Sequence, residues 1–408
     1  MRLVMVALVL TCGCSGSTPP ADATADAVPS SDGLGRPDGN RHEASLLDQG
    51  QPDASARDGA KVPDAGTTSA WAIVAESDEV AQTMGTMLTM HPSKPKTLAV
   101  KANLLDTAAY PKLMTNLTVL VSDDLGQTMK KVVVKSFETN LPGGEDTPYG
   151  FYFDPSNGQR LALLTFLMTA APKPGPGPNY DSLLFATSID GGASFSQSNL
   201  ITNPWPPDTF KFGSRTKSLL MVRAQHVLYA SEDLGKSLKV VFEDSKQCLA
   251  HGPFAVSPVD PDVFLLVCNS TLLRCEKTAC SPAKLPAGFI PYNMEFSPHD
   301  ASQVVVTGSN QVAASKDGGK TFPVSVTLSQ LYSTRIVFDP RPGAGAIYVL
   351  SRGANKLYRS LDGGQSYVSI SPPDLKLPLS TVVRDVDIAA DGAVVAIAHP
   401  GIIRLPAP

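Results

Sequence analysis

One short pattern recurs through most of this 408-residue chain: Ser-x-Asp-x-Gly-x-x-aromatic. Three copies end in an aromatic residue, and their defining residues are Ser188, Asp190, Gly192 and Phe195; Ser315, Asp317, Gly319 and Phe322; and Ser360, Asp362, Gly364 and Tyr367. Two weaker copies end in Met or Leu, with defining residues Ser122, Asp124 and Gly126, and Ser231, Asp233 and Gly235. Self-similarity at a period of roughly 45 residues indicates a repeat architecture in which each repeat is one supersecondary unit.

Each copy, called a box below, has the composition of a tight turn. The Ser and Asp oxygens can accept hydrogen bonds from backbone N–H groups of the same turn, and Gly tolerates a positive φ. The aromatic side chain can then fold back onto its own repeat. We therefore expect the box acids to be structural rather than catalytic.

A second element recurs between the boxes: an apolar strand that ends in Pro and a polar turn. The copies are MLTMHP from Met87, FYFDP from Phe151, FAVSP from Phe254, MEFSP from Met294 and RIVFDP from Arg335. Apolar strands bounded by Pro, Asp and Gly, without a helical period, predict an all-β domain. The clearest repeat divides into four strands, at 335–339, 346–350, 356–360 and 365–370, and its box forms the hairpin between the last two.

Counting the first strands gives the number of repeats. They begin near Met87, Phe151, Phe210, Phe254, Met294, Arg335 and Val386, and the last unit has three strands before the chain ends. Residues 69–75 can supply its missing fourth strand, which closes the ring and removes free sheet edges. We predict a single seven-bladed β-propeller of four-stranded blades over residues 69–408. Six or eight blades remain alternatives, because the third and seventh units are degenerate.

Four cysteines lie within the predicted propeller. Between the boxes at 231 and 315 one box is missing, and Cys275 aligns with its serine. We expect a Cys275–Cys280 disulfide to close that hairpin, which leaves Cys248 to pair with Cys268. Four cysteines allow three connectivities, and a zinc site is the weaker alternative because no second close Cys pair is present.

The N-terminus predicts export. One positive charge precedes a short apolar run, Leu3 to Leu10, which is too short to span a bilayer and is typical of a secretory signal. The run ends in a segment that resembles a bacterial lipobox, with Gly13 before Cys14. This resemblance implies a signal peptide over residues 1–13 and a lipid on Cys14. Cys12 is the alternative, because Thr11 stands where Leu is usual, and plain secretion is another. The predicted location is the cell envelope: outer membrane, periplasmic or surface-exposed.

Residues 14–68 differ sharply in composition from the rest. They hold no aromatic residue, and nine acidic residues stand against four basic ones. Such a segment cannot bury enough apolar area to offset its ordering entropy, so a disordered linker is predicted. The whole chain has a formal charge of −4, which provides no basic field for nucleic acid. We expect a monomer that touches the membrane only through its lipid.

The five boxes resemble the Asp-box, or BNR, repeats of sialidases, sortilin-type receptors, xyloglucan-cleaving glycosidases and photosystem II assembly factors. The resemblance implies the propeller fold but not one function, because the box occurs in enzymes and in binding proteins. The sialidase chemistry needs an arginine triad, with its first arginine in an Arg-Ile-Pro segment early in the propeller. Here Arg335-Ile336-Val337 comes late and lacks the proline.

Other catalytic signatures are also missing from the sequence, including the nucleophile elbow, the P-loop and His-Glu-x-x-His. The six histidines show no metal-ligand spacing, so neither a cofactor nor a metal is predicted. His91 and His299 flank the prolines of the strand-ending turns, where we expect solvated turn residues.

Two functional hypotheses follow. The first is a non-enzymatic binding or assembly scaffold for a protein or glycan, and the second is an extracellular glycoside hydrolase, sialidase-like or other. Two carboxylates within about 5 to 10 Å of each other in the central mouth, flanked by Arg or aromatic residues, would favour the enzyme. Small apolar and neutral groups there would favour the scaffold.

The ligand face is predicted from connectivity. Turns between the third and fourth strands carry the boxes, so loops between the second and third strands lie on the opposite face. Two such loops are expected to be long, at 103–116 and 169–181. With the nearby link 201–208, they place Tyr180 and Trp205 on that face. Large aromatic residues on stiff loops are common binding anchors, so we expect these two to line the ligand site.

Overall fold

The computed structural model describes residues 71–76, 86–106, 114–138, 146–167, 183–198, 209–213, 218–224, 226–244, 248, 252–328, 331, 334–351, 355–371, 383–398 and 401–408. The chain divides into residues 1–64 and 65–408, and all described residues belong to the second unit. The signal peptide, Cys14 and the whole linker therefore lie outside the described residues. Within the described ranges, no helix is long and apolar enough to cross a membrane.

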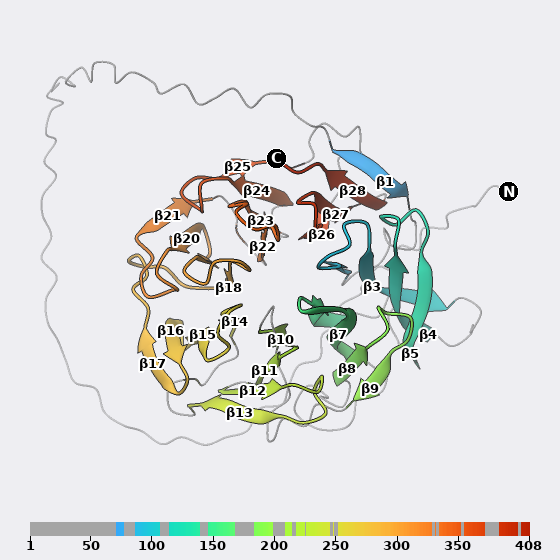
Figure 1. Cartoon of the computed structure of the whole chain (residues 1–408), viewed down its shortest axis with the longest axis horizontal. Helices are drawn as coiled ribbons and strands as arrows, with labels where there is room; N and C mark the ends of the chain where they lie inside the picture. Colours follow the sequence, from blue (N-terminus) through green and yellow to red (C-terminus); the bar gives the residue numbers. More distant parts are fainter. Residues whose placement is uncertain are drawn as a thin grey trace, which may run out of the picture. The chain divides into compact units, whose positions relative to one another are not determined.

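The described part is a ring of seven antiparallel four-stranded sheets, as the sequence predicts (Figure 1). Blade 1 contains β2 (Met87–Met90), β3 (Leu98–Asp106), β4 (Met114–Ser122) and β5 (Lys130–Glu138), and blade 2 contains β6 (Asp146–Asp154), β7 (Asn157–Leu167), β8 (Leu183–Ser188) and β9 (Ser196–Ser198). Blade 3 contains β10 (Thr209–Phe212), β11 (Leu220–Ala224), β12 (Val227–Ser231) and β13 (Lys239–Glu243), and blade 4 contains β14 (Phe254–Val256), β15 (Val263–Cys268), β16 (Thr271–Glu276) and β17 (Ala279–Pro282). Blade 5 contains β18 (Asn293–Phe296), β19 (Val304–Thr307), β20 (Gln311–Ser315) and β21 (Val324–Thr327), and blade 6 contains β22 (Thr334–Phe338), β23 (Ile347–Ser351), β24 (Lys356–Ser360) and β25 (Val368–Ser369). Blade 7 contains β26 (Val383–Ile388), β27 (Val394–Ala398), β28 (Gly401–Leu405) and β1 (Ala72–Glu76).

The N-terminal strand closes the ring, which confirms the predicted closure. β1 pairs with β28 in antiparallel register and forms the outermost strand of blade 7. Trp71, just before β1, donates from Nε1 to the carbonyl of Ile370 in blade 6 at 3.0 Å. The two ends of the propeller sequence are thus joined in one sheet.

The core lies between the blades. Second strands such as β23 and β27 are almost wholly apolar and buried along their length. Such strands need continuous apolar runs rather than alternation, because a neighbouring blade covers each face. Hydrophobic clusters accordingly join consecutive blades: Leu117 and Leu161 belong to one cluster, and Tyr348 and Val386 to another.

The five boxes form one repeated turn. In each, the Gly N–H donates to the Ser Oγ at 2.7–3.0 Å, and the Ser hydroxyl donates to the Asp Oδ1 at 2.7–2.8 Å. A further hydroxyl, which the sequence reasoning did not use, donates to the Asp Oδ2 at 2.5–2.6 Å from the seventh position: Thr128, Ser194, Ser237, Thr321 or Ser366.

The box glycine has a second role, in contact between blades. Gly192 has φ of +89°, and a Cβ there would lie 2.8 Å from Cγ2 of Val121 in blade 1. Gly126 has φ of +88°, and its Cβ would lie 2.4 Å from Cδ1 of Ile402 in blade 7. Any other residue would meet both backbone strain and a clash with the preceding blade.

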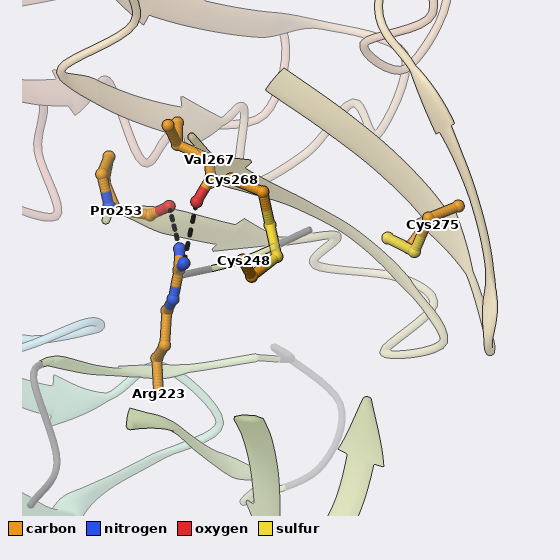
Figure 2. The surroundings of a disulfide bond; sticks show 7 residues. Arg223, Cys248, Pro253, Val267, Cys268 and Cys275 are labelled. Atoms are coloured by element: carbon orange, nitrogen blue, oxygen red, sulfur yellow. Dashed lines mark hydrogen bonds between the residues drawn. A yellow bond between two sulfur atoms is a disulfide. The ribbon is translucent and has the colours of Figure 1, made fainter. Parts of the chain in front are cut away.

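Blade 4 has a disulfide where the other hairpins have a box. Cys275 on β16 is bonded to its cross-strand neighbour Cys280 on β17. A second disulfide joins Cys248 to Cys268 at the end of β15, so the connectivity is the one that the sequence favours. Figure 2 shows Arg223 of blade 3 beside the second bond, with its guanidinium donating to the carbonyls of Pro253 (3.1 Å) and Val267 (2.8 Å). Blades 3 and 4 are therefore joined through a buried arginine.

One loop prediction is wrong. Residues 103–116 do not form a long loop, because β3 and β4 continue their pairing as far as Asp106 and Met114, and Leu104 lies opposite Asn116. The longer ladder satisfies backbone N–H and C=O groups that a loop would leave to solvent. The other predicted loop, at 169–181, lies outside the described residues.

Candidate functional site

The first strand of each blade lies nearest the axis of the ring (Figure 1). These inner strands are β2, β6, β10, β14, β18, β22 and β26, and all seven contribute to a central cavity of about 420 Å³. Five of them are followed by a proline that also lines the cavity, which we call the rim: Pro92, Pro155, Pro258, Pro298 and Pro340. The recurrent strand-Pro pattern of the sequence therefore surrounds one end of the cavity, on the face that carries the boxes.

Pairing with the second strands places the inner strands in a common register. At one level every inner strand carries an apolar residue that lines the cavity, and we call this level the collar: Met90, Phe153, Phe212, Val256, Phe296, Phe338 and Ile388. One residue earlier comes a mixed level, the belt: Thr89, Tyr152, Lys211, Ala255, Glu295, Val337 and Asp387. A ligand in the cavity would meet apolar side chains near the rim and polar ones beneath them.

Charged residues of blades 6 and 7 form a buried network at this site. Arg335 pairs with Asp385 and, at 3.6 Å, with Asp387. The same carboxylates reach blade 1, where Asp385 accepts from the Leu88 N–H and Asp387 from the Met90 N–H, each at 2.8 Å. Because the inner edge of β2 has no neighbouring strand, these side chains satisfy N–H groups that would otherwise face the cavity.

Burial and charge act in opposite directions in this network. Burial alone would lower the pKa of Arg335, but the Asp385 and Asp387 carboxylates outweigh it and raise that pKa above its ordinary value. For Asp387 the balance is reversed: burial raises the pKa of the carboxyl, although Arg335 and two backbone N–H groups oppose the shift. The Asp387 carboxyl thus holds its proton more readily than an ordinary aspartate does.

A second ion pair crosses blade 4. Lys211 on β10 contacts Glu295 on β18 and donates to the carbonyl of Met294 at 3.0 Å. The belt residue of the intervening β14 is Ala255, which is fully buried. A small side chain there leaves space for the lysine to pass. Tyr152 also lines the cavity.

The sequence did not single out the residues that the cavity brings together. Lys211, Glu295, Asp385 and Asp387 are ordinary charges in ordinary strands, and Arg335 was considered only as a member of a sialidase motif. The sequence nevertheless contains a usable signal, because the residue three positions before each strand-ending proline belongs to the belt: Thr89, Tyr152, Ala255, Glu295 and Val337. The predicted ligand-face residues, Tyr180 and Trp205, lie outside the described residues, as does the link 201–208.

His91 requires a correction. The sequence predicts a solvated turn residue, and this prediction is wrong, because His91 is 5% exposed and its ring lies against the ring of Phe153. His299, by contrast, is exposed and contacts the carbonyl of Pro340. Among the residues described, no group of three or more His, Cys, Asp or Glu side chains is arranged to hold a metal ion.

Comparison with known proteins supports the fold. No protein-family model matches the sequence, and no curated protein matches it. One similar solved structure is "YCF48 bound to D1 peptide", with a TM-score of 0.51 and 16% identity over 80% of this chain and 94% of that one. Another is YCF48 from Cyanidioschyzon merolae, with a TM-score of 0.50 and 12% identity over 83% of this chain and 99% of that one. The likeness to both structures supports the propeller fold that the seven four-stranded sheets form.

Proposed function

We propose that this chain is a binding scaffold that holds a segment of a protein partner at the central cavity of its propeller. One observation carries the proposal: all seven blades contribute side chains to a single cavity of about 420 Å³, with an apolar collar above the mixed belt. A cavity of this size and composition suits a few side chains or a short peptide segment.

The similar structures support a protein ligand. One of them is a YCF48 in complex with a D1 peptide, so a propeller of this shape binds a peptide in that protein. We extend the role, though not the identity of the peptide, to this chain.

Electrostatics at the cavity also favours recognition by shape. Arg335 and Lys211 are each engaged by carboxylates of the cavity wall. A carboxylate or phosphate ligand would have to compete with these internal anions. Apolar contact with the collar and hydrogen bonds to groups such as Tyr152 are better sources of affinity.

A glycoside hydrolase is the second candidate, and one observation favours it. The cavity contains two carboxylates, Glu295 and Asp387, with Arg335 and Tyr152 beside them. A glycosidase needs one carboxyl with a raised pKa as the acid and a second in ionised form. Asp387 has the raised pKa. Its two backbone hydrogen bonds and its ion pair hold it in the wall, however, and this is why the scaffold is the first choice.

Site-specific photo-crosslinking in the native cell tests the scaffold. One crosslinker replaces Val259, which is 62% exposed beside the rim, and another replaces Tyr292, which is 49% exposed where the chain enters β18 on the opposite face. The control position is Val133, 48% exposed on the outer strand β5. We expect a discrete protein adduct at one or both mouth positions and none at Val133. Adducts at all three positions alike, or at none, would contradict a specific partner at the cavity.

A panel of aryl glycosides, with and without Glu295→Gln, decides between the two candidates. Turnover that Glu295→Gln abolishes would replace the scaffold by the hydrolase. Absence of turnover, together with an adduct at the mouth, would support the scaffold. A glycan array tests in parallel whether the ligand is a sugar rather than a protein.

The proposal includes a location. A lipid on Cys14, with residues 14–68 as the linker, would hold the propeller at the cell envelope, as the lipobox-like segment suggests. In this arrangement the propeller works as a monomer displayed from a membrane, and Tyr180 and Trp205 extend the ligand site on the face opposite the boxes.

A further inference from the structure

His91 occupies a position where other blades carry a simple hydrogen-bond acceptor. It directly precedes the rim proline, as Asp154, Ser257, Ser297 and Asp339 do in their blades. In three of these the side chain accepts a backbone N–H of the following turn: Asp154 from Ser156 at 2.8 Å, Asp339 from Arg341 at 3.0 Å and Ser257 from Asp260 at 3.3 Å. The position therefore fixes the turn between the first two strands at the rim.

In blade 1 the acceptor is the imidazole nitrogen Nδ1. It accepts from the N–H groups of Ser93 and Lys94, each at 3.2 Å. A nitrogen that accepts two N–H bonds carries no proton, so the ring is neutral and its hydrogen is on Nε2. Unlike Asp or Ser, this acceptor disappears when the side chain takes up a second proton.

The other end of the ring enters blade 2. Nε2 is buried and has no hydrogen-bond partner. It lies so close to Gly158 at the start of β7 that a Cβ at this glycine would be 2.2 Å away. The ring thus fills a space between blades 1 and 2 that exists because residue 158 is Gly.

The surroundings offer little compensation for a positive charge. Burial lowers the pKa of His91, Lys94 on the same turn lowers it further, and Asp123 in the box turn of blade 1 opposes them. Asp123 already accepts a hydrogen bond from Thr97 at 2.6 Å. From blade 2, the neutral Phe153 and Gly158 contact the ring, while the nearby Asp154 carboxylate is bonded to Ser156 and Ser218.

We propose that His91 is a proton-sensitive latch at the mouth of the cavity: protonation breaks the hydrogen bonds that fix the rim turn of blade 1 and opens the contact with blade 2. In acid, Nδ1 becomes a donor that faces two other donors, Ser93 N–H and Lys94 N–H, and of its hydrogen-bond partners only the Ser93 hydroxyl, 3.4 Å away, can accept from it. A charged Nε2–H then lies against Gly158 without an acceptor. The consequence that mild acid releases a bound partner rests on the proposed function, whereas the opening itself does not.

Hydrogen exchange measured by mass spectrometry tests the latch without any partner. Exchange of peptides covering 91–98 and 151–161 is compared at pH 7.5, 6.5 and 5.5, after correction for intrinsic rates. If the open form binds one more proton than the closed form, the equilibrium constant for opening rises up to tenfold for each pH unit of acidification. We therefore expect the protection factors of both segments to fall by up to tenfold for each pH unit below pH 6.5. Peptides from blades 4 and 5 should not change in this range.

Variants at His91 and a second histidine complete the test. His91→Asn supplies an acceptor that does not titrate, so protection of both segments should become independent of pH, whereas the control His299→Asn should behave like the wild type. If His91→Asn does not fold, His91→Ser replaces it, and the nitrogen chemical shifts of His91 in the wild type give an independent readout. The same acid response in the His91 variant, or a doubly protonated ring at pH 6.5 in the folded wild type, would overturn the latch. A crosslinked partner that stays bound while the latch opens would instead contradict only the link to release.

Discussion

Replacing Asp385 with Asn should destabilise the ring at the seam between blades 7 and 1. The Asp385 carboxylate is fully buried, accepts the Leu88 N–H at 2.8 Å and pairs with Arg335. Asn can still accept from the Leu88 amide, but it removes the negative charge. Arg335, whose side chain is 14% exposed, then keeps Asp387 at 3.6 Å as its acidic partner within the described network.

The expected cost follows from this geometry. Removing one member of a buried ion pair typically costs about 3–5 kcal/mol, because the other charge is left without full compensation. Since Asp387 retains part of the interaction with Arg335, we expect Asp385→Asn to lower the free energy of unfolding by about 3 kcal/mol. Adding Arg335→Met removes the uncompensated charge, so the double variant should recover about half of that loss.

Urea titrations at pH 7 measure these free energies, and a surface ion pair provides the control. Asp391 pairs with Arg404 at 2.6 Å, and its side chain is 41% exposed. Asp391→Asn should therefore cost less than about 1 kcal/mol. The reasoning fails if Asp385→Asn lowers the free energy of unfolding no more than Asp391→Asn does. It also fails if the loss in the double variant equals the sum of the losses in the two single variants.

Five further predictions concern the boxes, the anchor, and Tyr180 and Trp205. Asp317→Ala or Asp362→Ala should cost about 1–3 kcal/mol, because turn N–H groups lose an acceptor; loss of binding without loss of stability would contradict a structural role. Hydrogen bonds lower the pKa of all five box aspartates to about 2, against an ordinary 3.8, so their stabilisation should be complete above about pH 4 and disappear towards pH 2 in an acid titration. Gly192→Ala should lower the melting temperature far more than Gly343→Ala, which has a similar positive φ but nothing within 4 Å. Cys14→Ser should move the protein from the membrane fraction to the soluble fraction, and Cys12→Ser should not. Trp205→Ala and Tyr180→Ala should each weaken capture of the partner and leave the melting temperature nearly unchanged.

The fold could be predicted from the sequence because its signals are local. Each box is eight residues long, and its Ser and Asp side chains accept several N–H groups of their own turn, so its hairpin can be recognised without knowing its neighbours. The missing box in blade 4 was equally informative, because the Cys275–Cys280 hairpin takes its place. The loop predicted at 103–116 is wrong because the strands extend further than the sequence indicates: β3 and β4 pair from Leu98 and Ser122 as far as Asp106 and Met114.

The cavity could not be predicted in the same way, because its contacts join distant parts of the chain. Leu88 and Asp385 are separated by 297 residues, and Lys211 and Glu295 by 84. Nothing local distinguishes these charges from others on exposed strands. The exception is His91, which shares its position before the rim proline with Asp and Ser. That comparison identifies an acceptor, whereas burial against Phe153 depends on the neighbouring blade.

The seam between blades 7 and 1 is held at both ends of blade 7. At its outer end, β1 adds the fourth strand through backbone pairing with β28. At its inner end, Asp385 and Asp387 satisfy the free edge of β2 through side chains. Blade 1 therefore depends on one neighbour for ion-paired carboxylates, and on the other for the contact of a neutral histidine with Gly158. Protonation weakens the His91 contact, because only the neutral ring accepts at Nδ1 and burial lowers the pKa of this side chain. Blade 1 is therefore the blade that we expect to loosen first on its blade 2 side as the pH falls below about 6.5.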